Sequence, residues 1–471
     1  MPLYIRTDRR VVRSLFASAF ALITVPAYAQ GNEPAQAPVQ DGGAEVSLSN
    51  PSAPAAGPSL ERFSPRLEGL DPDDRRVLRP RAPGAGQLSG KTVLERQRPE
   101  YDPVGLRAGG FQIFPQVLTE AGYDSNVFTQ RNANSDIYAR LRGDLLVQSD
   151  FGRHALGFGG YVEERAFAQQ KTESGITYSA SASGRLDIST QSSLSANVER
   201  SHLFVNRGSS TEVLLTRKPV RYDRTTGEIG AHTQRGRFAF DLTGLVSEYD
   251  YDDALTPDGR PSNQQFRDTT RYEGRLEVGY GSGAGPQIFA SFAADFRRFR
   301  LESTPDRDSD GIEILAGVRG DITPLIRGRV GVGYIRANFK DPTVDSRQGI
   351  GIDAQIDYLV TELTTLRLSA RRSFKNVSSV TTPAAFTTEF VVGADHELLR
   401  NLILSARAAY EYAKYTDFQR RVRNYRTSIG AYYFVNRRMA IEANASYGQA
   451  RASDTRDYRE VNAALGVIFQ L

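Results

Sequence analysis

The chain ends on the stretch 461–471, which reads Val-Asn-Ala-Ala-Leu-Gly-Val-Ile-Phe-Gln-Leu. Its side chains alternate with a period of two, as in a β-strand with two different faces. A transmembrane barrel strand needs this alternation, because one face meets lipid and the other meets water. The apolar face holds Val461, Ala463, Leu465, Val467, Phe469 and Leu471, and the other face holds Asn462, Ala464, Gly466, Ile468 and Gln470.

The same period recurs upstream, from about Gly110 onward. Eighteen such segments lie between residues 111 and 471, and the gaps between them are eight short turns and nine longer polar loops. An even strand number with both ends on the short-turn side gives this count, and bacterial barrels have short periplasmic turns. The sequence therefore predicts an all-β fold over residues 105–471, a transmembrane antiparallel up-and-down barrel of about 18 strands.

A large soluble β-protein also alternates, so the period alone leaves that alternative open. Charged residues stand at mid-strand positions on the polar face of nearly every segment, for example in 137–147, 312–322 and 402–412. Such charges suit a wide, wet lumen better than the core of a soluble sandwich. This favours the membrane barrel.

The N-terminus predicts export. Residues 1–29 combine a positive region, an apolar run over 15–25 and the cleavage motif Ala27-Tyr28-Ala29. We expect cleavage near Ala29 and localisation in the outer membrane of a Gram-negative cell. Loss of residues 1–29 removes four Arg and one Asp from 59 basic and 55 acidic residues, which leaves 55 and 54. A net charge of +1 gives no reason to expect a nucleic-acid partner.

Residues 30–104 differ from the rest in composition, since eleven of the 22 prolines lie between 30 and 103. A Pro-rich, polar segment buries too little apolar surface to offset its ordering entropy. We predict a disordered periplasmic leader. The alternative is a plug or a tail that binds a partner.

Arginine dominates the basic residues, since the chain has only six Lys. Arg offers a planar fork to carboxylates and phosphates, so an Arg-rich lumen favours anionic or sugar solutes. The alternative is a ladder of Arg–carboxylate pairs that satisfies the inner wall. The candidate lumen-lining residues are Arg140, Arg142, Asp144, Arg185, Arg275, Arg297, Arg319, Arg327, Arg329, Arg367, Arg371 and Arg407.

No catalytic set emerges from the sequence. The histidines, His154, His202, His232 and His396, lack metal-ligand spacing, and no G-x-S-x-G motif occurs. The chain also has no Cys. We therefore expect no enzymatic activity, no metal site and no cofactor.

Residues 111–128 resemble the opening of the putative β-barrel porin 2 family of bacterial outer-membrane proteins. The resemblance rests on Pro115 within the first strand and on the step Gly-Tyr-Asp-Ser-Asn-Val-Phe at 122–128. In layout it extends over roughly residues 105–471. It implies fold and location and transfers no active-site residue. The chain departs from the usual barrel signal in ending on Leu471, with Phe469 two residues earlier.

These observations lead us to expect a porin-like channel for small hydrophilic solutes, and anionic solutes are one class that the Arg-rich lumen would suit. Two alternatives stay open: an exporter of an acidic exopolysaccharide, and a structural or adhesive outer-membrane barrel. The expected partners are outer-membrane lipid and lipopolysaccharide, the barrel-assembly machinery, and a small solute or polysaccharide.

Overall fold

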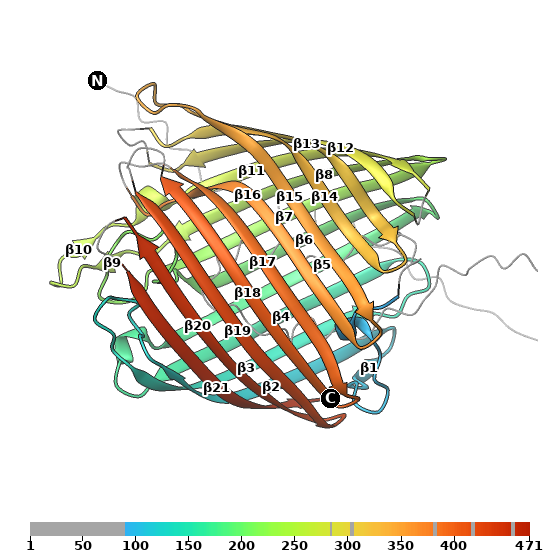
Figure 1. Cartoon of the computed structure of the whole chain (residues 1–471), viewed down its shortest axis with the longest axis horizontal. Helices are drawn as coiled ribbons and strands as arrows, with labels where there is room; N and C mark the ends of the chain where they lie inside the picture. The colour runs from blue at the N-terminus through green and yellow to red at the C-terminus, as the bar shows by residue number, and fades with distance from the viewer. Residues whose placement is uncertain (1–89, 283–284, 302–305, 380–383, 416–419, 454–456) are drawn as a thin grey trace, which may run out of the picture. The chain divides into compact units, whose positions relative to one another are not determined.

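The computed structural model describes residues 90–471 except 283–284, 302–305, 380–383, 416–419 and 454–456. The export signal expected at 1–29 and the leader up to residue 89 lie outside the described residues. From residue 106 onward the chain is a single closed antiparallel sheet with long loops and short turns (Figure 1). The predicted all-β, 18-stranded barrel is confirmed.

The main sheet has 19 strands, and without the three-residue β1 (Leu106–Ala108) the barrel wall has 18. Closure comes from β2 and β21, which pair from Gln116↔Gln470 to Asp124↔Asn462. The wall strands are β2 (Phe111–Asp124), β3 (Asp136–Ser149), β4 (Ala155–Phe167), β5 (Gly175–Ser189), β6 (Ser192–Phe204), β7 (Arg221–Arg235), β8 (Phe238–Tyr251), β11 (Thr269–Gly281), β12 (Gln287–Phe299), β13 (Ser309–Thr323), β14 (Ile326–Phe339), β15 (Arg347–Thr361), β16 (Thr364–Asn376), β17 (Ala384–Leu399), β18 (Leu402–Tyr415), β19 (Arg421–Asn436), β20 (Met439–Ala452) and β21 (Tyr458–Gln470).

The remaining elements are short. The loop between β8 and β11 carries the small sheet of β9 (Ala254–Leu255) and β10 (Pro261–Ser262). Three single-turn 3₁₀ helices are described: η3 (Val93–Glu95), η4 (Lys171–Glu173) and η5 (Gln265–Arg267). Among the residues that the structure describes, no helix has the length and apolar character needed to cross a bilayer.

The connections alternate as the sequence predicts. Short turns follow β3, β5, β7, β11, β13, β15, β17 and β19, and the longer loops join the other consecutive strands. The turn of residues 236–237, for example, contains Gly236 at φ 59°, a conformation that glycine adopts without steric cost. The two ends of the barrel are called here the short-turn end and the long-loop end.

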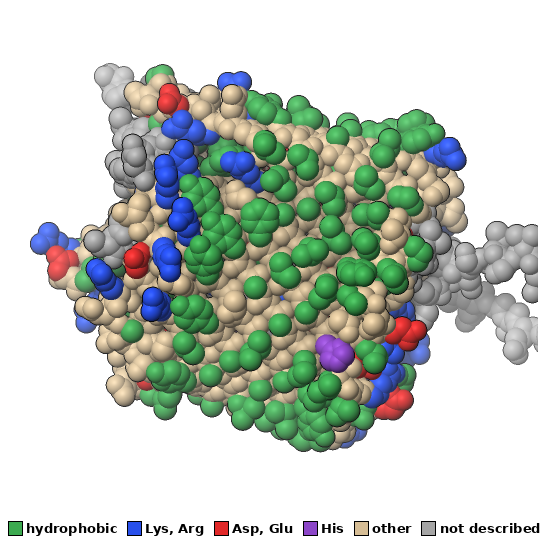
Figure 2. Space-filling model, viewed as in Figure 1, with side chains coloured by type: hydrophobic (Ala, Val, Ile, Leu, Met, Phe, Trp, Pro, Cys, Tyr) green, Lys and Arg blue, Asp and Glu red, His purple; other side chains and the backbone are tan. Residues whose placement is uncertain are grey.

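The faces of the strands also follow the sequence pattern. On β21, Leu465 is 60% exposed and Phe469 is 53% exposed, whereas Ile468 and Gln470 are buried. Apolar side chains cover the outside of the wall (Figure 2). Because lipid is apolar, this surface is the one that a bilayer would cover.

The wall is irregular at one seam, between β15 and β16. Their ladder ends at the pair Asp353↔Arg371, so residues 347–352 pair only with β14 and residues 372–376 only with β17. Beyond this point the hairpin of β16 and β17 bends into the barrel. Phe374 and Phe386, which alternation places on the outer face, pack against Ile335 on the inner face of β14. The sheet therefore overlaps itself here.

Glycine permits this overlap. A Cβ on Gly349 of β15 would lie 3.2 Å from the Phe386 ring. The stacked rings of Phe374 and Phe386, 4.5 Å apart, thus lie against β15 at a position that has no side chain. Arg297 stabilises the free edge, because its Nη2 donates to the Phe374 carbonyl at 2.8 Å.

Candidate functional site

The candidate arginines lie on the inner face, where most of them form ion pairs with carboxylates. On β3, Arg140 pairs with Glu120, and Arg142 pairs with both Asp144 (2.7 Å) and Glu163 (3.1 Å). Arg185 pairs with Asp187 at 2.7 Å. In this part of the lumen wall, the positive charges of the arginines are nearly balanced by the negative charges of their carboxylate partners.

A larger network crosses from β8 to β15. Arg319 reaches Asp241 at 2.7 Å, and both Arg319 and Arg329 bind Glu277. Arg329 also pairs with Asp353 at 3.1 Å. Since these residues come from five strands, the network ties together nearly a third of the inner wall.

The rest of the inner ladder lies near the short-turn end. Arg407 Nη2 donates to both carboxylate oxygens of Asp395, at 2.8 and 2.9 Å, and both residues are buried. Arg327 and Arg367 share Asp357, at 3.1 and 3.5 Å. A hydrogen bond between two charged groups, as between Arg407 and Asp395, is stronger than one between neutral groups.

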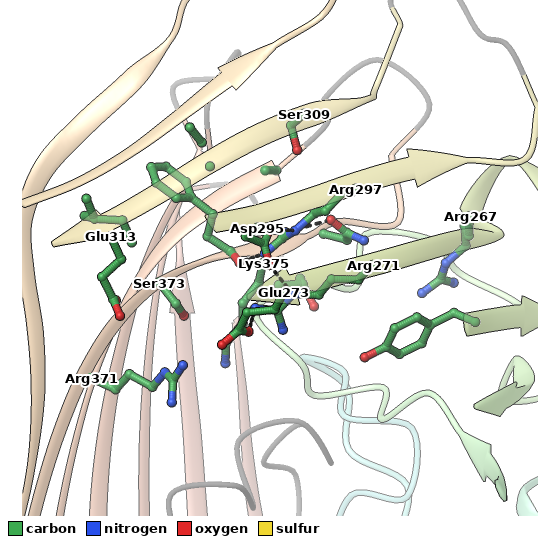
Figure 3. A pocket seen from close by; sticks show the side chains of 18 of the residues that line it. Arg267, Arg271, Glu273, Asp295, Arg297, Ser309, Glu313, Arg371, Ser373 and Lys375 are labelled. Carbon is green, nitrogen blue, oxygen red and sulfur yellow. Dashed lines mark hydrogen bonds and ion pairs between the residues drawn. The ribbon is translucent and has the colours of Figure 1, made fainter. Parts of the chain in front are cut away.

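A cavity of about 190 Å³ opens between β8, β11–β14, β16 and the β6–β7 loop. Figure 3 shows charged side chains converging on it from several strands. Its wall carries three carboxylates that are all paired: Glu273 with Arg271 (2.7 Å), Asp295 with Arg297 (2.9 Å), and Glu313 with Arg275 (2.9 Å).

Arg371 differs from its neighbours on this wall. Among the described residues, no side chain lies within hydrogen-bond or ion-pair distance of its guanidinium, although Glu273 is near enough to interact with it electrostatically. Figure 3 shows Arg371 on the same wall as Glu273 and Glu313. The cause is the seam: Arg371 is the last β16 residue paired with β15, and its partner across the ladder, Asp353, is bound to Arg329. The three carboxylates on the cavity wall are held by Arg271, Arg275 and Arg297, so none of them forms an ion pair with Arg371.

Two connections narrow the long-loop end. The β6–β7 loop, residues 205–220, crosses to the opposite wall, where the Tyr415 hydroxyl donates to the Ser210 carbonyl at 2.8 Å. Ser210 in turn donates to Glu411 at 2.7 Å. The loop also meets the inward hairpin, because the backbone N–H of Val213 donates to Ser378 Oγ at 2.6 Å. The sequence did not predict this loop's inward course.

The short-turn end contains the segment 92–102, here called the plug segment. It begins with a capping box in which Thr92 Oγ1 accepts from the Glu95 N–H and Glu95 Oε2 accepts from the Thr92 N–H. Val93 and Leu94 are buried in a cluster with inner-face residues of β2 and β18–β21: Leu118, Ile403, Tyr432, Phe434, Ala440 and Ile468.

Polar contacts hold the plug segment to several strands and turns. Thr365 Oγ1 accepts from the Val93 N–H at 3.0 Å, and Arg327 pairs with Glu95 at 2.6 Å. The fully buried Arg98 pairs with Glu397, and Arg437 donates to the Pro99 carbonyl at 2.8 Å. The structure therefore differs from the expectation of disorder over the end of the leader, because these residues find an apolar site and charged partners inside the barrel.

A closed ladder, an apolar outer wall and a charged interior define a transmembrane β-barrel. The chain belongs to the family described as putative beta-barrel porin 2, whose model matches residues 98–471. The resemblance seen in residues 111–128 is thereby confirmed, and the protein is an outer-membrane β-barrel.

Several solved structures are similar to the chain at low identity. The chain is similar to the outer membrane protein opdK from Pseudomonas aeruginosa (TM-score 0.39, 10% identity, 76% of this chain and 99% of that chain). It is also similar to OccAB4 from Acinetobacter baumannii (0.40, 9%, 80% and 100%) and to the siderophore receptor PirA from Pseudomonas aeruginosa (0.38, 7%, 78% and 81%). No curated protein is significantly similar to the chain in sequence. At these identities no activity transfers to this protein.

Proposed function

We propose that the protein is an outer-membrane channel for small hydrophilic anions. The observation that carries this proposal is the unpaired guanidinium of Arg371 on the cavity wall. The carboxylates Glu273, Asp295 and Glu313 already have arginine partners, and none of them forms an ion pair with Arg371, although Glu273 is near enough to offset part of its charge. A cation that faces a narrow, polar passage attracts anions and repels cations.

The size of the cavity favours small solutes. A cavity of about 190 Å³ has room for several water molecules and thus for a small solute. An exporter of an acidic polysaccharide needs a wide continuous bore, and the β6–β7 loop and the inward hairpin of β16 and β17 both reduce the bore. This is why the small-solute channel is preferred over the exporter.

Reversal potential across a KCl gradient in planar bilayers tests the proposal. We expect chloride preference in the wild type and a smaller preference in Arg371→Gln. Arg372→Gln is the matched control, because Arg372 is adjacent but lies over the Phe386 ring, 4.1 Å from its centre. Cation preference would contradict the anion channel, and absence of any conductance would favour a structural or adhesive barrel.

A further inference from the structure

Five cations gather on the outer face of β18–β21, next to the long loops. Figure 2 shows Lys and Arg side chains collected near the long-loop ends of the strands labelled β17–β20 in Figure 1. All five are exposed, and they alternate along their strands with buried residues such as Val422 and Asn424. This basic patch consists of Lys414, Arg421, Arg423, Arg451 and Arg459.

The patch places like charges directly opposite each other. Lys414 is the cross-strand partner of Arg421, and Arg423 is the partner of Arg451. Like charges at directly opposed positions destabilise a sheet. On the inner face the opposite holds, since Arg140 faces Glu120 and Arg142 faces Glu163.

No carboxylate within the described part of the chain comes within ion-pair distance of the five patch cations, although the inner wall pairs most of its charges. Guanidinium and ammonium groups stay charged at neutral pH. Within the described residues the patch therefore consists of like charges that repel one another, and an external anion would reduce that repulsion.

Tyrosines fix the level of the patch relative to a membrane. Tyr410 and Tyr425, with ring centres 5.1 Å apart, lie on the same outer face, further from the long loops than the patch. Tyr425 is two residues from Arg423, and Tyr410 is four residues from Lys414. Tyr412 is the cross-strand partner of Arg423, and Tyr447 lies beyond Arg451 on β20. Tyrosine belts sit at the height of lipid headgroups. The cations thus stand at or just above that height.

We propose that the basic patch binds the phosphate groups of phosphorylated lipids in the leaflet that surrounds the long-loop end. Arg421, Arg423 and Arg451 offer planar forks that match phosphate oxygens, and one phosphate between Arg423 and Arg451 would be shared by both. This site lies outside the lumen and is independent of the proposed transport function.

Native mass spectrometry of the purified barrel in a neutral detergent tests the site, with lipid A as the phosphorylated probe. We expect the wild type to retain lipid A, and the triple variant Arg421→Gln, Arg423→Gln, Arg451→Gln to bind it roughly a hundredfold more weakly, at about fivefold per cation. The control triple variant Arg235→Gln, Arg237→Gln, Arg438→Gln removes three exposed cations at the short-turn end and should bind as the wild type does.

Two further measurements sharpen the test. Without lipid A, the patch variant should unfold at the same or a higher temperature than the wild type, because it lacks the like-charge pairs. Lipid A freed of its phosphates should bind the wild type and the patch variant equally weakly. Equal retention of lipid A by both proteins would overturn the proposal. So would complete displacement of lipid A by an equal concentration of inorganic phosphate, which would reduce the patch to a general anion site.

Discussion

Arg98 and Glu397 are 299 positions apart in the chain and form an ion pair that is almost completely shielded from water. Their side chains are 0% and 4% exposed. Arg98 belongs to the plug segment and Glu397 to the end of β17, so the pair fastens the end of the leader to the inner wall. Such a pair is costly to break from one side, because the remaining charge stays buried.

Replacing Arg98 should release the plug segment. In Arg98→Ala, Glu397 keeps only Arg400 at 3.5 Å and Arg96 at 3.9 Å, so we expect a loss near the lower end of the usual range, about 3 kcal/mol of docking free energy. Limited trypsin digestion followed by mass spectrometry should show faster cleavage after Arg96. Arg107→Ala breaks the exposed pair with Asp150 and serves as the control, with about 0–1 kcal/mol expected. Equal protection in both variants would contradict the anchoring role.

A low pH should weaken the binding of the plug segment inside the barrel. Burial raises the pKa of Glu95, but the charge of Arg327 and the hydrogen bonds from Thr92 outweigh it and hold the pKa below the usual 4.5. A carboxylate whose pKa is lowered by docking stabilises the docked state at pH values above its ordinary pKa. This stabilisation is lost as the pH falls through the lowered pKa. Single-channel conductance should therefore rise as the pH falls below the usual pKa of 4.5 and Glu95 becomes protonated.

The variant Glu95→Gln separates this effect from the titration of other lumen carboxylates. It should conduct better than the wild type already at neutral pH and respond less to acid. If wild type and Glu95→Gln have the same pH profile, Glu95 does not control the docking.

A disulfide should lock the plug segment. Val93 and Thr365 are in contact, since Thr365 Oγ1 accepts from the Val93 N–H at 3.0 Å, and the chain has no Cys of its own. In Val93→Cys with Thr365→Cys, the oxidised protein should show no acid-induced rise in conductance, and dithiothreitol should restore it. Each single-cysteine variant is a control. A rise that persists in the oxidised protein would show that acid acts elsewhere.

Neighbouring positions on β6 should respond oppositely to an added charge. Val198 faces outward opposite Ala182 and Gly227, and Val198→Arg should cost about 2–4 kcal/mol near the middle of the bilayer. Asn197 faces inward opposite Glu228, so Asn197→Arg places unlike charges side by side and should be tolerated. Urea titration of the heat-modifiable band on gels compares the two. A larger loss for Asn197→Arg would reverse the assignment of the faces.

The alternation of side chains was enough to predict the barrel, its strand number and the faces of β21. These properties are local, because each strand must present one face to lipid wherever it lies. The lumen contacts are not local. Which carboxylate meets Arg98, or why Arg371 meets none, depends on which strands face each other and on where the ladder of β15 and β16 ends.

One signal for the plug segment was present in the sequence. Thr92-Val93-Leu94-Glu95 has the spacing of a capping box, with two apolar residues between its ends. The Pro-rich composition of residues 30–104 outweighed this signal in the prediction. Composition is an average over the whole segment, whereas only its last residues, 92–102, bind inside the barrel. The inward course of the β6–β7 loop had no comparable signal, since loop residues lack a period.

The overlap at the seam gives the two rims of the barrel different stiffness. At the short-turn end, backbone hydrogen bonds join β15 to β16 and fix the circumference. At the long-loop end, β15 and β16 share no backbone hydrogen bond, and the edge is held by side chains: Phe374 and Phe386 pack against Ile335, and Arg297 donates to the Phe374 carbonyl. A change of perimeter at the short-turn end would have to break backbone bonds between β15 and β16, whereas a change at the long-loop end would have to displace side-chain contacts only.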